Sequence, residues 1–278
     1  MTKHLIWIFA VWLGSILSVS AQTHVDEKGE EGNTTTLWIN NGERQIYGLL
    51  NRPTQSDGPL PIAIVSHGFN GSHRFTQDYF EALAELGWMT YTFDFPCGSL
   101  GSRSDANTMN MSILDEQSDL CAIINYFLHQ SYVDASRIML IGESQGGLIS
   151  ALAAAEMPQQ VSHLVLIYPA FCIPDNWNNR YPRLEDIPDT TRLWNVPMGR
   201  RFFEELRSMN PFSSMERFKR PVLIIQGDAD RIVSVQDSRR AAKSYPDARL
   251  HIISGAGHGF KARERQEAIE QIKFFLIQ

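Results

Sequence analysis

From Thr34 to the C-terminus, short apolar runs alternate with amphipathic segments, and glycine or proline separates many of them. Continuous apolar runs predict buried strands, and a 3.6-residue spacing of apolar positions predicts helices. The predicted strands are 60–68, 88–95, 136–142, 161–169, 221–227 and 248–257, and the predicted helices are 74–87, 112–130, 146–158, 236–245 and 262–277. This alternation indicates an α/β fold, an open and mostly parallel central sheet with helices on both faces.

Two segments do not follow this alternation of strands and helices. Residues 34–40 and 44–51 read as paired strands joined by the turn "NNGE", a hairpin at the start of the sheet. Residues 170–215 are rich in proline, tryptophan, tyrosine and charge, and they follow neither period. We expect them to form an insertion between elements of the sheet. Because open α/β sheets bind ligands beyond the carboxyl ends of their strands, catalytic residues should directly follow strands.

The N-terminus has the pattern of a secretory signal. A basic start is followed by an uncharged apolar run, and small residues at Val19 and Ala21 precede Gln22. The sequence therefore predicts a signal peptide over 1–21, a polar leader over 22–33, and one α/β domain over 34–278. The alternative is an uncleaved membrane anchor. Cleavage would give a secreted or periplasmic protein without stable membrane insertion.

Composition and charge exclude several kinds of partner. The 278 residues carry a net charge of −6 with no block of lysine and arginine, so we expect no nucleic-acid partner. Metal-ligand spacing, a phosphate-binding loop and a dinucleotide fingerprint are all missing from the sequence, so we predict no metal and no cofactor. Three cysteines, Cys97, Cys121 and Cys172, are too few for a disulfide scaffold. One bridge could form, but free thiols are favoured.

The candidate nucleophile is Ser144 in "GESQG", which matches G-x-S-x-G. In that pattern a serine stands on a sharp turn between a strand and a helix, where Gly142 and Gly146 allow the two elements to approach closely. The same letters could form only a flexible corner. The apolar strand before the motif and the Ala/Leu-rich helix after it favour the nucleophile.

A serine nucleophile needs a base and an acid that orients the base. In this chain order, both should follow later strands. "GDADRIV" offers Asp228 and Asp230, and the residues themselves leave that choice open. "GAGHGF" offers His258, whereas the rival His251 lies inside a strand pattern and is expected to be structural.

The oxyanion of the reaction needs two backbone N–H donors. One should be Gln145, directly after the nucleophile, and the other should be Phe69 in the loop "SHGFNG". His67 in the same loop is expected to support the loop rather than react.

Together, "SHGFNG", "DFPCGSLGSRSD", "GESQGG", "GDADRIV" and "GAGHGF" resemble the α/β-hydrolase fold, and more narrowly the feruloyl (cinnamoyl) esterases. The resemblance extends from about Thr34 to the C-terminus. It implies Asp230 as the acid and Phe69 and Gln145 as the oxyanion donors. Glu143 stands where that family usually has histidine, and the loop "DFPCGSLGSRS" also departs from the family's "DFNGHGxS".

The resemblance also implies that residues 170–215 form a small lid insertion over the acyl pocket. We therefore name Asp189, Trp194 and Phe202 as candidate substrate contacts. The alternative for each residue is packing within the lid's own small core.

The sequence thus predicts a secreted serine hydrolase of carboxylic esters with a Ser144, His258 and Asp230 triad. Its expected partner is a small-molecule or oligosaccharide ester, such as a feruloylated or acetylated plant-wall sugar. A serine peptidase or thioesterase on the same fold is the enzymatic alternative. A non-catalytic binding protein on a hydrolase scaffold is the alternative of another class, and the intact set of three triad residues argues against it.

Overall fold

The computed structural model describes residues 33–54, 58–76 and 78–277. The predicted signal peptide and all but the last residue of the predicted leader lie outside the described residues. Within the described part of the chain, no helix has both the length and the apolar character needed to cross a membrane.

An eight-stranded sheet forms the centre of the molecule, in the order β1-β2-β4-β3-β5-β6-β9-β10. The β1–β2 and β2–β4 pairs are antiparallel, and the other pairs are parallel. The strands are β1 (Thr34–Asn41), β2 (Arg44–Asn51), β3 (Leu60–Ser66), β4 (Met89–Phe93), β5 (Val133–Glu143), β6 (His163–Ile167), β9 (Val222–Gly227) and β10 (Ala248–Ile253). The predicted α/β class and mostly parallel sheet are confirmed, including the N-terminal hairpin.

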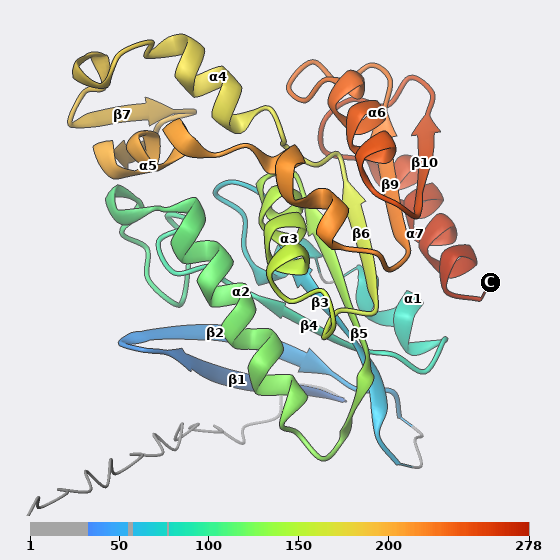
Figure 1. Ribbon diagram of the computed structural model, residues 1–278. Coiled ribbons are helices and arrows are strands. Elements are labelled where there is room, and N and C mark those ends of the chain that lie inside the picture. The colour runs from blue at the N-terminus through green and yellow to red at the C-terminus, as the bar shows by residue number, and fades with distance from the viewer. Residues whose placement is uncertain (1–32, 55–57, 77, 278) are drawn as a thin grey trace, which may run out of the picture.

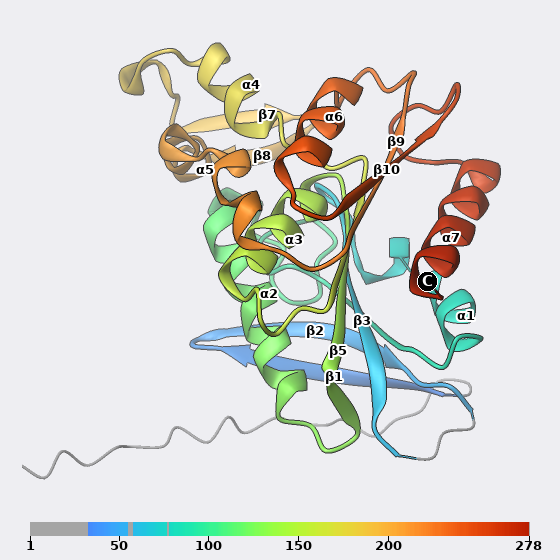
Figure 2. The same cartoon turned by 45° about the vertical axis from the view of Figure 1, so that its right-hand side comes forward.

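Helices cover both faces of this sheet (Figures 1 and 2). Helices α2, α3 and α6 pack on one face, and α1 and α7 pack on the other. The α-helices are α1 (Tyr79–Ala84), α2 (Ile113–Leu128), α3 (Gln145–Glu156), α4 (Ile173–Arg180), α5 (Arg200–Glu205), α6 (Val235–Ser244) and α7 (Ala262–Leu276). Short 3-10 helices are η1 (His73–Thr76), η2 (Thr108–Asn110), η3 (Leu184–Asp186), η4 (Leu206–Ser208) and η5 (Pro211–Arg217).

The two-residue period of the strands divides the core between the two faces. In β5, Ile138 and Leu140 pack with α2 and α3, whereas Met139 and Ile141 pack with α1 and α7. This register continues to the end of the strand and decides where Glu143 points.

One predicted helix is wrong in its extent. The pattern over 74–87 predicts a single helix, but the structure has η1 and then the short α1. The physical reason lies in the loop after β4, because the Asp94 carboxylate accepts hydrogen bonds from the His73 backbone N–H at 2.6 Å and the His73 ring at 2.8 Å. These bonds tie the start of η1 to the loop after β4.

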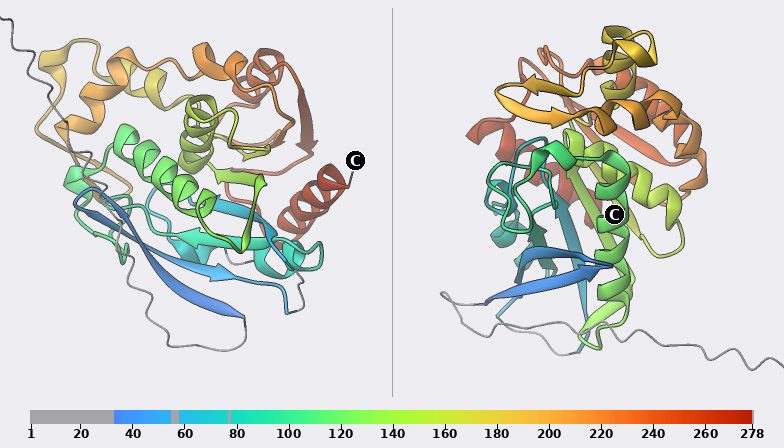
Figure 3. Two further views of the ribbon diagram at one scale, coloured as in Figure 1. Left: turned by 60° about the horizontal axis from the view of Figure 1, so that its bottom comes forward. Right: turned by 90° about the vertical axis from the view of Figure 1, so that its left-hand side faces the viewer.

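Residues 170–215 leave the sheet and lie beyond its carboxyl edge, above the N-terminus of α3 (Figures 1 and 3). They contain α4, α5 and a separate two-stranded sheet of β7 (Thr190–Leu193) and β8 (Val196–Gly199). Trp194 and Asn195 form the two-residue turn between these strands, with φ of 48° and 67°. Positive φ at both turn positions matches the right-handed twist of a hairpin.

Candidate active site

Ser144 occupies a strained turn between β5 and α3. Its φ of 52° and ψ of −117° lie outside the favoured regions for a residue with a side chain. The two motif glycines make this turn sterically possible. A methyl group at Gly142 would collide with the Gly146 carbonyl oxygen, and one at Gly146 would collide with the Ser66 carbonyl oxygen. The strand and the helix therefore meet as the motif predicts.

A continuous chain of hydrogen bonds links the three predicted triad residues. Ser144 Oγ lies 2.9 Å from His258 Nε2, and His258 Nδ1 lies 2.8 Å from Asp230 Oδ2. Each residue follows a strand, respectively β5, β10 and β9, so the fold brings them to one edge of the sheet. With the Nδ1 proton directed to Asp230, His258 Nε2 can accept the proton of the serine hydroxyl.

Asp230 is held as an ionised acceptor. Its Oδ1 accepts the backbone N–H groups of Ile232 and Val233 at 2.8 and 2.9 Å. Burial by itself would raise the pKa of this carboxyl, but the hydrogen bonds from His258, Val233 and Ile232 outweigh burial and hold the pKa below its usual value. Gln226 Nε2 also donates to Oδ2 at 3.0 Å. A negative charge is therefore available to orient the imidazole near neutral pH.

The two rival residues lie elsewhere. Asp228 is exposed and accepts the Gly255 N–H at 2.6 Å, so it caps the loop after β10. His251 Nε2 lies 2.8 Å from Glu267 Oε1 on α7, inside the strand pattern where the sequence placed it. Neither residue has a hydrogen bond to Ser144 or His258 among the described residues.

The predicted oxyanion donors lie beside the serine. Gln145 is the first residue of α3, and Phe69 follows Gly68, where a methyl group would stand 3.1 Å from Ser144 Cβ. Within the described chain, neither the Phe69 nor the Gln145 backbone N–H donates to another group, so both can serve a substrate oxygen. The structure thus brings these donors to the nucleophile.

Buried side chains support both donors. His67 Nδ1 lies 2.8 Å from the Gly68 carbonyl oxygen, and the Phe95 N–H donates to His67 Nε2 at 3.1 Å. Burial lowers the pKa of His67, so the neutral ring holds the loop, as expected for a supporting residue. The Gln145 side chain donates to Glu116 at 2.8 Å, and burial raises the pKa of Glu116 to about 8.

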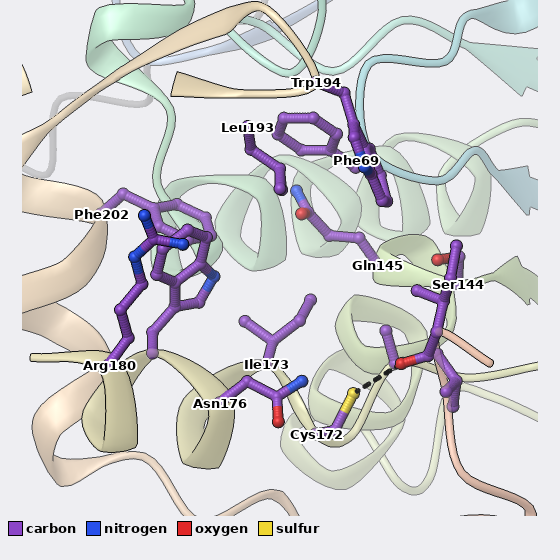
Figure 4. A pocket seen from close by; sticks show the side chains of 14 residues that line it. Phe69, Ser144, Gln145, Cys172, Ile173, Asn176, Arg180, Leu193, Trp194 and Phe202 are labelled. Atoms are coloured by element: carbon purple, nitrogen blue, oxygen red, sulfur yellow. Dashed lines mark hydrogen bonds between the residues drawn. The ribbon is translucent and has the colours of Figure 1, made fainter. Parts of the chain in front are cut away.

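A mostly apolar cavity of about 260 Å³ opens at Ser144 (Figure 4). Its lining includes two of the three predicted substrate contacts, Trp194 and Phe202. The Phe69 and Trp194 rings meet edge to face, with centroids 5.8 Å apart. Arg180 lies at the opposite end of the cavity from Ser144.

Asp189, the third predicted contact, is a correction. It is exposed and does not line the cavity. The reason is the β7–β8 hairpin, because its closed end at Trp194 faces the serine, whereas Asp189 precedes the open end, where Thr190 pairs with Gly199. The Asp189 carbonyl oxygen accepts the Arg200 N–H at 3.1 Å.

The sequence analysis missed most of the cavity wall. The lining residues that it did not predict for the site are Ala170, Cys172, Ile173, Asn176, Trp177, Arg180, Leu193, Ile232 and Val233. Several come from one side of α4, whose short length gives little periodic signal. Ile232 and Val233 directly follow the triad carboxylate, and this adjacency was a usable signal.

The described residues include three cysteines, of which Cys172 lies in the cavity wall. All three cysteines are free. Burial raises the pKa of Cys97 to about 12 and that of Cys172 to about 11, so both remain thiols at neutral pH. Among the described residues, no cluster of histidine, cysteine and carboxylate side chains could hold a metal ion.

A family model adds independent evidence, since the model of the dienelactone hydrolase family matches residues 46–273. The chain belongs to the dienelactone hydrolase family. This match covers most of the sheet, the turn at Ser144, the lid insertion and the loop that carries His258. It confirms the predicted enzyme class, a hydrolase on the α/β-hydrolase fold.

Among curated proteins, a Bacillus subtilis relative named "Uncharacterized peptidase YtmA" is 24% identical over 253 residues, which are 86% of this chain and 90% of that protein. Monoacylglycerol lipase ABHD6 of Rattus norvegicus is 31% identical over 186 residues. These cover 66% of this dienelactone hydrolase family member but only 51% of the lipase, about half of its length.

Solved structures share the fold of this family member. Est1E from Butyrivibrio proteoclasticus, solved with ferulic acid bound, superimposes with a TM-score of 0.79 at 24% identity, covering 87% of this chain and 98% of that one. Acetyl xylan esterase 1 from Thermoanaerobacterium sp. gives a TM-score of 0.70 at 17% identity, covering 93% of this chain and 89% of that one. At these identities the likeness establishes the shared fold.

Proposed function

We propose that this family member hydrolyses carboxylic esters through a covalent acyl-enzyme on Ser144. The observation that carries the proposal is the unbroken hydrogen-bonded chain from Ser144 through His258 to Asp230, at the mouth of an apolar cavity. A buried carboxylate, an imidazole and a hydroxyl in this order form the arrangement that activates a serine.

In the first half of the reaction, Ser144 Oγ attacks the ester carbonyl carbon while His258 Nε2 takes the hydroxyl proton. The oxygen of the tetrahedral intermediate accepts the Phe69 and Gln145 N–H groups. The bond to the alcohol oxygen then breaks, and His258 returns its proton to that oxygen. In the second half, water attacks the acyl-enzyme with His258 as the base, and the acid leaves with Ser144 restored.

For the acyl group, the cavity supports an aromatic acid of phenylpropanoid size. A cavity of about 150 Å³ can hold benzene, so about 260 Å³ leaves room for a ring with a short side chain. The aromatic rings in the cavity lining include Phe69, Trp177, Trp194 and Phe202. Edge and face contacts with these rings favour a flat substrate. The ferulic acid bound to Est1E is consistent with this proposal.

We also propose that the protein is exported from the cytoplasm. The support is the signal pattern of residues 1–21 in the sequence. Esters of plant-wall sugars would then be accessible to the enzyme outside the cytoplasm. Mass measurement of the mature chain, expected to begin at Gln22, tests this part separately.

A substrate panel tests the catalytic proposal. We expect hydrolysis of methyl ferulate and p-nitrophenyl acetate, with the higher kcat/KM for the ferulate, and slower or no cleavage of an aminoacyl amide. The matched control is Ser144→Ala, which should remain folded and lose turnover. Preferred cleavage of the amide would support a peptidase, the activity for which YtmA is named. No turnover of any ester, with no labelling by a fluorophosphonate, would support the non-catalytic alternative.

A further inference from the structure

Glu143, the residue before the nucleophile, is a buried carboxylate that the proposed reaction does not use. It is 1% exposed, and it accepts hydrogen bonds from the hydroxyls of Tyr79 and Tyr168, each at 2.7 Å. Arg265 forms a salt bridge with the same carboxylate. A carboxylate this deeply buried requires such partners, because removal from water strongly disfavours its charge.

The position of this cluster follows from the strand register. Glu143 continues the series Met139 and Ile141, so it points to the face covered by α1 and α7. Arg265 reaches it from α7, and the Arg265 Nε also lies 3.1 Å from Asp78. The cluster therefore joins the end of the nucleophile strand to the C-terminal helix.

Tyr168 connects this cluster to the catalytic base. Its ring packs against the His258 imidazole, with centroids 4.8 Å apart and the planes tilted by 57°, and its hydroxyl is bound to Glu143. Burial, with the negative charge of Glu143, raises the pKa of Tyr168 well above its usual value, so the hydroxyl stays a donor. The Phe260 ring also packs edge to face with the Tyr168 ring, with centroids 4.7 Å apart.

The backbone around Tyr168 is fastened to the serine turn. The Ser144 N–H donates to the Ile167 carbonyl oxygen at 3.0 Å, and the Ala170 N–H donates to the Ser144 carbonyl oxygen at 2.9 Å. Tyr168 itself has a φ of 37°, which an ordinary side chain rarely adopts. A strained residue held on both sides in this way is typical of a functional site.

We propose that Tyr168 is a positioning residue that holds the His258 ring in line with Ser144, and that Glu143 anchors it through the tyrosine hydroxyl. The inference rests on the proposed serine-hydrolase function and adds to it a part played by the buried cluster. A small tilt of the imidazole would lengthen the Ser144 to His258 hydrogen bond. Displacement of a catalytic group by about 1 Å can reduce the rate by about 100-fold.

Tyr79 provides a matched control. Like Tyr168, it is buried and donates its hydroxyl to Glu143 at the same distance. No ring contact joins Tyr79 to His258 among the described residues, and Tyr79 belongs to α1 rather than to the loop after β6. The Tyr79 hydroxyl also accepts a hydrogen bond from Arg265 at 2.6 Å, so a purely structural role predicts that Tyr79→Phe is at least as harmful as Tyr168→Phe.

The experiment compares Tyr168→Phe with Tyr79→Phe on p-nitrophenyl acetate, with melting temperature recorded for each. We expect a decrease in melting temperature for Tyr79→Phe at least as large as that for Tyr168→Phe, because Tyr79 also loses its bond from Arg265. We nevertheless expect an approximately tenfold lower kcat at unchanged KM for Tyr168→Phe, and a kcat within about twofold of the wild type for Tyr79→Phe. Tyr168→Leu, which also removes the ring, should lower kcat by about 100-fold. Equal kcat values in the two phenylalanine variants would overturn the proposal.

Two controls keep the outcomes separate. If the wild type fails to hydrolyse any ester, the proposed function fails before the role of Tyr168 is reached. If Tyr168→Leu does not fold, the comparison of the two phenylalanine variants still decides, because each substitution removes a single oxygen atom.

Discussion

Replacement of the triad carboxylate by an amide is the sharpest perturbation available at this site. In Asp230→Asn, the amide oxygen would keep the N–H groups of Ile232 and Val233, because the opposite orientation would leave two donors facing an NH₂ group. The NH₂ group must then face His258 Nδ1, which can only accept from it. The imidazole proton moves to Nε2 and points at Ser144, so the ring no longer acts as a base.

The expected loss is about 10⁴ in kcat, the size seen when this substitution imposes the wrong tautomer without disturbing the geometry. Four factors of ten at about 1.36 kcal/mol each correspond to about 5.4 kcal/mol of activation free energy. Because Gln226 Nε2 also faces the replaced oxygen, at 3.0 Å in the wild type, we expect a further modest loss of stability.

The assay is steady-state hydrolysis of p-nitrophenyl acetate at pH 7.5, with far-ultraviolet circular dichroism as the check on folding. Asp228→Asn is the matched control, because Asp228 is also in the loop after β9 but binds only the neighbouring turn, through Ser254 and Gly255. Its kcat should stay within about threefold of the wild type. A folded Asp230→Asn enzyme with a kcat within tenfold of the wild type would refute the assigned role of Asp230.

Three further predictions concern the turn at Ser144, the lid insertion and the buried Glu116. Gly146→Ala should yield no soluble folded protein, as judged by expression and circular dichroism, because the new methyl group would meet the Ser66 and His67 carbonyl oxygens. Trp194→Gly should raise the KM for methyl ferulate several-fold and leave the KM for p-nitrophenyl acetate nearly unchanged. The melting temperature should also change little, since glycine suits the φ of 48° and Trp194 is 63% exposed. Glu116 has a folded-state pKa of about 8, above its unfolded value of 4.5, so the unfolded chain loses this proton first as the pH rises. The free energy of unfolding should therefore fall between about pH 4.5 and 8, and urea titrations of Glu116→Gln should show a smaller fall; an equal fall would contradict this assignment.

Much of the fold could be predicted because each element carries its own local signal. The apolar runs locate the parallel strands to within a few residues, and the "GESQG" motif identifies the turn at Ser144 because glycine is sterically required there. The choice of Asp230 over Asp228 had no such local signal and came from the family resemblance. Only the tertiary structure shows that Asp228 caps a turn while Asp230 faces the imidazole.

The structure of the lid insertion, residues 170–215, was far less predictable. The α4 helix and the β7–β8 hairpin position its aromatic side chains, and neither element is long enough to show a periodic pattern in the sequence. Asp189 was therefore placed in the pocket by its position in the sequence, whereas the hairpin carries it away from the serine. The neighbouring sequence also gave no sign of the buried cluster around Glu143. Its partners Tyr168 and Arg265 are distant in the sequence and come close to it only in the folded protein.

The central claim is that Ser144 forms a covalent acyl bond. Its most direct test is mass spectrometry of the enzyme quenched in acid during turnover of p-nitrophenyl acetate, followed by peptide mapping. The account predicts an acetyl group on the peptide that contains Ser144, and its loss in Ser144→Ala. Acetylation confined to another residue, such as Cys172 at the cavity wall, would contradict the account, as would undiminished turnover in Ser144→Ala.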